Sequence, residues 1–209
     1  MVRIAEPHPP GGSWRPRLPS VPPTQRARFA RAGLTAASVW AVGALFVSVV
    51  PTYAATLLGT HNLALLGAIS AVMLGTACAT QVLSLRRGLP PATGQYLGLV
   101  LAVGLIALVA AFPPRSLLIL IAAAVLAGAG LGLGFVGAQT QINQLAPAQR
   151  RGEVTAAFIT CLYSGVTVAA VGVGLLSDAL SLFAAVSVVA GVIAATALLT
   201  AVWHWRTAD

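Results

Sequence analysis

Charged side chains are scarce in this 209-residue sequence: they make up 8% of it, and lysine is absent. A typical soluble domain carries about 25% charged residues. Because 58% of the residues are hydrophobic, too few polar side chains remain to cover a soluble surface. This shortage excludes an ordinary soluble domain and indicates that lipid surrounds the chain. The net charge of +8 comes from arginines that gather at the ends of apolar runs, which is typical of membrane topology and not of nucleic-acid binding.

Acidic residues and cysteines are also few. The acids nearest the apolar runs, Glu153 and Asp178, lie at their ends and not within them. Since intramembrane charges usually mark ion or proton pathways, we expect no proton relay in this chain alone. Cys78 and Cys161 lie inside apolar runs, where we expect small core residues and neither a disulfide framework nor a metal site.

A hydrolase is disfavoured as well. Ser164-Gly165 lies in the middle of an apolar run, but Leu162 occupies the place where a Gly-x-Ser-x-Gly elbow needs glycine. We expect no histidine at that depth to act as a base. The sequence therefore predicts no enzyme, no catalytic residue and no cofactor.

Six apolar runs divide the chain, each about 20–27 residues long, which is enough to cross a hydrocarbon core of about 30 Å with some tilt. They are expected at about residues 32–57, 63–85, 93–112, 116–137, 154–176 and 179–203. The sequence thus predicts an all-α membrane protein in three parts. These are a flexible Pro/Arg-rich cytoplasmic arm (1–28), a six-span bundle (29–205) and a short cytoplasmic tail (206–209).

The arginines predict the orientation. With both termini in the cytoplasm, Arg115 is the one arginine on the outer side. The arginines that then lie on the inner side are Arg3, Arg15, Arg17, Arg26, Arg28, Arg31, Arg86, Arg87, Arg150, Arg151 and Arg206. The inverse topology would reverse this bias. We therefore expect a multi-pass protein of the plasma membrane with both ends inside.

A tight basic turn joins the fourth and fifth runs. Pro147 cannot continue the incoming helix and biases Ala146 away from helical backbone angles. Glu153 falls in the first turn of the outgoing helix, where the helix dipole favours a negative side chain. The candidate cytoplasmic loop and gating residues are Arg86, Arg87, Arg150, Arg151 and Glu153.

Small and polar residues mark the interior of the runs. Glycines four residues apart let helices approach closely, and glycine also permits bending, so both roles remain open. The candidate helix-packing glycines are Gly128, Gly130, Gly132, Gly134, Gly165, Gly172 and Gly174. Hydroxyl groups in the runs should bond to their own helix backbone or to a neighbouring helix. Pro51 should kink the first run, provided that neighbours satisfy the carbonyl it frees.

Several of these segments together resemble the C-terminal half of a major facilitator superfamily (MFS) permease. The matching segments are Trp40-Ala-Val-Gly-Ala-Leu-Phe-Val-Ser48 with Pro51, the Arg86-Arg87 turn, the glycine-rich fourth run, the loop Leu145-Ala-Pro-Ala-Gln-Arg-Arg-Gly152 and the glycines from Gly165 to Gly174. The resemblance covers about residues 26–203. The sequence departs from the family in the loop after the second run, where Gly75 is present but Gln81 and Leu85 replace the acidic and basic partners.

The resemblance implies transport of a small solute by alternating access, in a protein built from two six-span bundles of 3+3 inverted repeats. Runs one and four would face the central cavity, and runs two and five the other bundle. The implied cavity-lining residues are Trp40, Ser48, Tyr53, Phe135, Gln139 and Tyr163. The expected partners are the lipid bilayer, a solute and a second six-span bundle, because the chain matches half a permease: a truncated frame, a split subunit or a half that dimerises. The alternative is a non-transporting scaffold or accessory subunit, such as a decayed permease.

Overall fold

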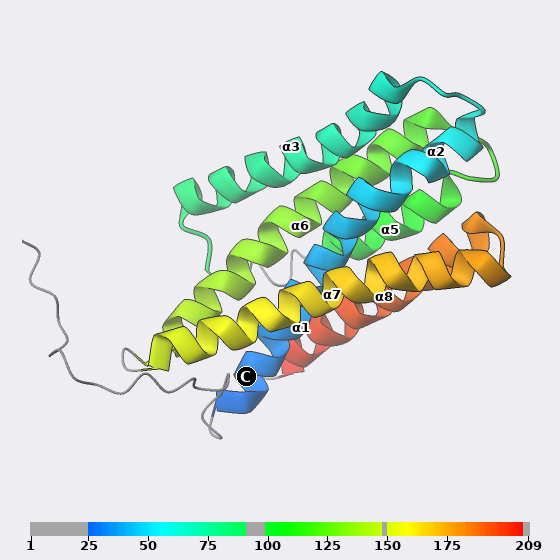
Figure 1. Cartoon of the computed structure of the whole chain (residues 1–209). Helices are drawn as coiled ribbons and strands as arrows, with labels where there is room; N and C mark the ends of the chain where they lie inside the picture. The colour runs from blue at the N-terminus through cyan, green and yellow to red at the C-terminus, as the bar shows by residue number, and fades with distance from the viewer. Residues whose placement is uncertain (1–24, 91–98, 148–149, 207–209) are drawn as a thin grey trace, which may run out of the picture.

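The structure is a computed structural model that describes residues 25–90, 99–147 and 150–206. Within these ranges every regular element is a helix, as Figure 1 shows. In chain order the helices are α1 (Arg26–Ala44), η2 (Leu45–Val49), α2 (Val50–Leu58), α3 (Leu63–Arg87), α5 (Leu99–Ala110), α6 (Leu117–Leu145), α7 (Arg151–Ala179) and α8 (Leu182–Arg206). The prediction of an all-α chain is confirmed.

The lengths of these helices fit a membrane protein. α1, η2 and α2 run on as one helix, Arg26–Leu58, and with α3, α6, α7 and α8 they give five described helices that are long and apolar enough to cross a membrane. α5 is equally apolar but has 12 residues. The third run was expected from about residue 93, and residues 91–98 lie outside the described part. The sixth span therefore stays a prediction.

Turn residues lie at the helix ends, which are close to the expected ends of the first two apolar runs. Gly59 and Gly88 follow α2 and α3 with φ of 64° and 59°, a left-handed conformation that glycine adopts without strain. Asn62 begins α3, because its side-chain oxygen accepts hydrogen bonds from the Ala64 and Leu65 amides. Ala146 leaves the helical region at φ −80° and ψ 109°, as expected for a residue before proline.

The first span contains a wide turn that the sequence did not predict. η2 is π-helical, and the Val50 amide donates to the carbonyl of Leu45, five residues earlier. In the same ladder the amide of residue 51 would donate to the Phe46 carbonyl, but Pro51 has no N–H. The Ser70 hydroxyl of α3 donates to that carbonyl instead, at 2.6 Å. A neighbouring helix thus satisfies the carbonyl that Pro51 leaves free.

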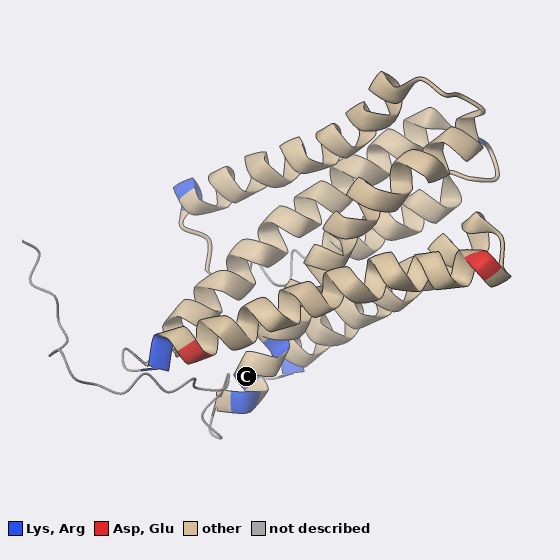
Figure 2. Ribbon diagram, viewed as in Figure 1, with Lys and Arg blue, Asp and Glu red and all other residues tan. Residues whose placement is uncertain are grey.

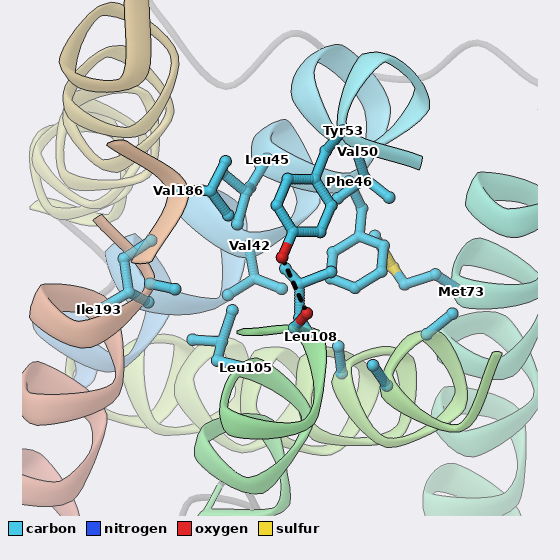
Figure 3. Close-up of a cluster of buried hydrophobic side chains, with 14 of the residues drawn as sticks. Val42, Leu45, Phe46, Val50, Tyr53, Met73, Leu105, Leu108, Val186 and Ile193 are labelled. Atoms are coloured by element: carbon cyan, nitrogen blue, oxygen red, sulfur yellow. Dashed lines mark hydrogen bonds between the residues drawn. The ribbon is translucent and has the colours of Figure 1, made fainter. Parts of the chain in front are cut away.

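The core lies where α1, η2 and α2 pass between the other helices. α1 contacts α6, α7 and α8, while α6 contacts α3 and α5 as well. Figure 3 shows part of this core, where Tyr53 lies among Leu45, Phe46 and Val50 and points toward α5. The Tyr53 hydroxyl donates to the Leu108 carbonyl at 3.2 Å.

Glycines set the separation of the central helices. A Cβ added to Gly130 of α6 would collide with the backbone of Leu101 in α5, and one added to Gly128 with the carbonyl of Met73 in α3. Gly132 meets Ala77 of α3 in the same way. These three glycines let α6 approach α3 on one side and α5 on the other.

Charge divides the two ends of the bundle. Figure 2 shows the arginines of the α1 start, the α3 end, the α7 start and the α8 end at one end of the molecule. Arg115 lies between α5 and α6, and Asp178 lies in the last turn of α7. The arginines of the described helices therefore gather at one end of the bundle. This agrees with the arrangement of spans expected from the sequence, which places these arginines on one side of the membrane.

Candidate functional site

A pocket of about 370 Å³ lies between α1 with η2, α3, α6 and α7. Its wall comes from the middle parts of these helices. The lining residues are Trp40, Gly43, Ala44, Val47, Leu74, Gln81, Leu131, Phe135, Tyr163 and Val166. Its volume falls at the lower end of the range of about 300–1,000 Å³ that small-molecule sites occupy.

Three aromatic rings meet at the pocket. The Trp40 ring lies 6.0 Å from the ring of Phe135 on α6 and 6.0 Å from that of Tyr163 on α7, measured between centroids. The interplanar angles are 56° and 58°, so the rings are tilted and not stacked face to face. This separation is within the range of about 4.5–7 Å that aromatic pairs favour. The structure thus brings together three of the six residues expected to line a cavity.

The other three expected cavity residues lie elsewhere. Tyr53 is fully buried in the core and bonded to Leu108, because the helix turns its side chain toward α5 and not toward the pocket. Ser48 is exposed, and its hydroxyl donates to the Ala44 carbonyl one turn earlier at 2.6 Å. The Gln139 amide donates to the Asn143 side chain at 3.3 Å, one turn further along α6. In this conformation none of these three side chains lines the aromatic pocket.

Gln81 is a polar lining residue that is absent from the six expected cavity residues. In the sequence it marks a departure from the family pattern. Its spacing of seven residues from Leu74 places both on one face of α3, and both line the pocket. That spacing, combined with the scarcity of amides in the second run, is the signal that identifies it.

The basic loop residues lie at the helix ends, away from the pocket. Arg86 and Arg87 form the last turn of α3 and are exposed. Arg150 precedes α7, and its Nε lies 3.9 Å from the Glu153 carboxylate in the first turn. The Arg150 side chain is 53% exposed, so this pair adds little stability.

The remaining candidate glycines differ from one another. A Cβ at Gly165 would collide with the backbone of Ala37 in α1, so α7 and α1 approach closely there. Gly172 has ordinary space, with the nearest Val189 carbon at 3.7 Å, and Gly174 has no heavy atom within 4 Å. Gly134 is buried in α6. The close approach of α7 therefore depends on Gly165 and not on the two later glycines.

Hydroxyl groups on the α7 surface bond within their own helix. Thr160, Ser164 and Thr167 each donate to the carbonyl four residues earlier, at 2.8–3.0 Å. The described residues hold no group of three or more His, Cys, Asp or Glu side chains that could bind a metal ion. Neither these hydroxyls nor a metal cluster offers a site in the described part of the chain, whereas the pocket brings three aromatic rings together with the Gln81 amide.

No protein-family model and no curated protein matches the chain. The resemblance to MFS permeases therefore rests on the sequence segments quoted above. The fold and the pocket are findings about this chain, and its function is inferred from them.

Proposed function

We propose that this chain is one six-span bundle, equivalent to the C-terminal half of an MFS permease, of a transporter that moves a small solute by alternating access. The bundle would consist of two inverted repeats, α1 to α5 and α6 to α8. The observation that carries the proposal is the pattern of contacts between helices.

This pattern has the form of a two-fold exchange. Exchanging α1 with α6, α3 with α7 and α5 with α8 turns the α3–α6 contact into α7–α1 and the α5–α6 contact into α8–α1. All four contacts are present, together with α1–α6 and α5–α8, which exchange into themselves. Inverted repeats of three helices related by a two-fold axis produce such a pattern. The α7–α8 contact would pair with one between α3 and the third span, whose expected beginning is outside the described residues.

The pocket supports a transport site. It lies between α1, α3, α6 and α7, which form two exchange pairs of this pattern. Transporters built from inverted repeats bind their solutes near the middle of the membrane, where the repeats meet. Trp40 and Tyr163 lie near the middle of their helices, at the corresponding depth.

The exposed faces of α3 and α7 support a second bundle as partner. These two are the least buried of the five described helices of spanning length. Small residues are exposed on α3 at four-residue spacing, at Gly67, Ala71, Gly75 and Ala79. Such a surface lets another helix approach closely. The partner would be a separate six-span half or a second copy of this chain.

The arginine distribution supports a cytoplasmic location for the end that holds both described chain ends. Cytoplasmic loops carry an excess of arginine and lysine, and the α1 start and the α8 end lie at the arginine-rich end. We propose a plasma-membrane protein in this orientation.

The test is solute counterflow in proteoliposomes that contain the purified 209-residue chain, with a panel of radiolabelled small solutes and empty liposomes as control. The same measurement is made with a six-span bundle from a neighbouring reading frame co-expressed. Saturable exchange of any solute supports transport. A stable assembly that exchanges none of them, alone or with the second bundle, contradicts it and favours the scaffold alternative.

A further inference from the structure

We infer that the aromatic pocket binds an uncharged, mainly apolar solute that carries an aromatic ring and one hydrogen-bonding group. The inference rests on the proposed function for the fate of the solute after binding, but the binding itself is measured without transport.

The lining defines the apolar part of this solute. Besides the three aromatic rings, aliphatic side chains complete the wall, including Val47, Leu74 and Leu131. Water contacts with such a surface are unfavourable, and an apolar solute that displaces them gains the transfer free energy. A sugar or another highly hydroxylated solute would lose its hydrogen bonds to water here and find only the Gln81 amide, the Tyr163 hydroxyl and the Trp40 indole N–H of the described lining in exchange.

The ring geometry favours an aromatic solute. Trp40 is tilted against Phe135 and Tyr163 by 56° and 58° at 6.0 Å. Tilted rings present both edges and faces, and aromatic groups attract each other in offset or edge-to-face arrangements. Tyr163 is 59% exposed, and Trp40 is partly buried. Ring surface is therefore accessible to a solute.

The absence of charge among the lining residues excludes ions. The described lining contains no Arg, Asp, Glu or His. A carboxylate or an ammonium group buried without a partner is strongly unfavourable. Aromatic faces attract cations, but the described lining contains no acidic side chain that could neutralise a bound cation. A neutral solute fits this wall best.

Gln81 supplies the directional polar contact. Its amide makes no hydrogen bond to any other described residue, and it lines the pocket. An amide both donates and accepts, so a hydroxyl, carbonyl or amine of the solute can pair with it. The Tyr163 hydroxyl and the Trp40 indole N–H are the other polar side-chain groups of the described lining, so a solute with few polar groups matches this arrangement.

A matched series of naphthalene compounds tests these features. The probes are naphthalene, 2-naphthol, 2-naphthoate and (2-naphthylmethyl)trimethylammonium, which share a ring and differ in polar group and charge. Binding to the full chain in lipid nanodiscs is measured by equilibrium dialysis at neutral pH, and partition into empty nanodiscs is subtracted. We expect saturable binding of 2-naphthol, roughly three- to tenfold tighter than that of naphthalene. The naphthoate should show no saturable binding, and the ammonium compound should bind at least about tenfold more weakly than 2-naphthol.

Substitutions locate the binding. Trp40→Ala should weaken binding of 2-naphthol by about tenfold or more, while the matched Trp205→Ala, at a site that is 74% exposed on α8, should not change it. Trp40→Phe keeps a ring and should retain most of the affinity, which separates loss of the site from loss of folding. Gln81→Leu should abolish the preference for 2-naphthol over naphthalene without weakening naphthalene, a ratio that a purely structural role would not alter.

Three results would overturn the inference: no saturable binding of any neutral probe, equal or tighter binding of a charged probe, or unchanged binding in Trp40→Ala. The failure of the proposed function looks different. Saturable 2-naphthol binding without counterflow of any solute supports the inferred solute class and contradicts transport. Counterflow of charged or sugar-like solutes alone supports transport and contradicts the inferred solute class.

Discussion

Ser70 satisfies the backbone group that Pro51 leaves free in the first span. Its hydroxyl joins α3 to the Phe46 carbonyl at 2.6 Å. Ser70→Ala should destabilise the protein by about 0.6 kcal/mol and by no more than about 1.7 kcal/mol, the average and the maximum measured for hydrogen bonds between membrane helices. The matched control is Ser187→Ala, because the Ser187 hydroxyl donates within its own helix, to Phe183. Unfolding in mixed micelles by increasing denaturing detergent measures both. Equal effects of the two substitutions would show that the interhelical bond is unimportant.

At this scale the sequence predicted the chemistry of the site better than its geometry. Trp40, Phe135 and Tyr163 were expected near a cavity and do meet at one. Tyr53 was assigned from family analogy alone, and its direction depends on packing against α5, which the sequence does not specify. The place of Gln81 in the lining is not predictable from the sequence, because it depends on which face of α3 turns toward α6, a tertiary property.

The close contact between α5 and α6 depends on Gly130, which has no side chain. Gly130→Ala should destabilise the bundle by about 1–3 kcal/mol, because its Cβ would overlap the backbone of Leu101 and force the helices apart. Gly191→Ala in α8 is the control, since no heavy atom lies within 4 Å of the added Cβ. There the substitution should be neutral or stabilise the helix by up to about 1 kcal/mol. The melting temperatures of the two purified variants in one detergent decide; a Gly130→Ala variant as stable as Gly191→Ala would contradict this account.

The basic turn between α6 and α7 should act in membrane insertion. Arg150→Ala with Arg151→Ala removes two positive charges from a short loop, so fewer molecules should insert this hairpin correctly. Arg150→Lys with Arg151→Lys keeps the charge and should insert normally. Insertion is measured by substituting Ser181→Cys and labelling the new cysteine from the outer side of the membrane. The background carries serine in place of Cys78 and Cys161.

Two further positions check the orientation in the same experiment. Thr60→Cys, in the turn after α2, should be labelled from outside, and Leu89→Cys, after α3, should be protected. The reverse result would overturn the proposed orientation. Normal labelling of Ser181→Cys in the alanine variant would show that these arginines do not direct insertion.

Helix ends were predictable because they depend on local chemistry. Pro147, Gly59, Gly88 and Asn62 each act through their own backbone or side chain, and the observed ends agree with them. The wide turn of η2 was not predictable, since it depends on a carbonyl of one helix meeting a hydroxyl of another.

For the molecule as a whole, the exposed faces of α3 and α7 predict a protein that is not stable as a monomer. Gly75→Leu places a bulky side chain on the exposed face of α3, where a Cβ meets no heavy atom of this chain. It should leave the fold intact but weaken assembly with a second bundle, whereas Gly191→Leu on α8 should not. Light scattering in mild detergent gives the mass of each. A parent chain that is a stable monomer would contradict this prediction, as would equal masses for an assembled parent and the Gly75→Leu variant.

The π-helical turn of η2 also makes the length of the first span adjustable by one residue. A π-turn holds one residue more than the α-helical register needs, and the Val50 amide already bonds to Leu45 across it. Deleting Val49 would make Leu45 the ordinary acceptor, four residues earlier, and would leave Pro51 opposite the same Phe46 carbonyl. The deletion variant should therefore melt within a few degrees of the parent, while deletion of the buried Val39 in the regular part of α1 should not fold, because it rotates every later side chain by about 100°. Natural relatives of this chain should accordingly gain or lose one residue at η2 more readily than anywhere else in the span.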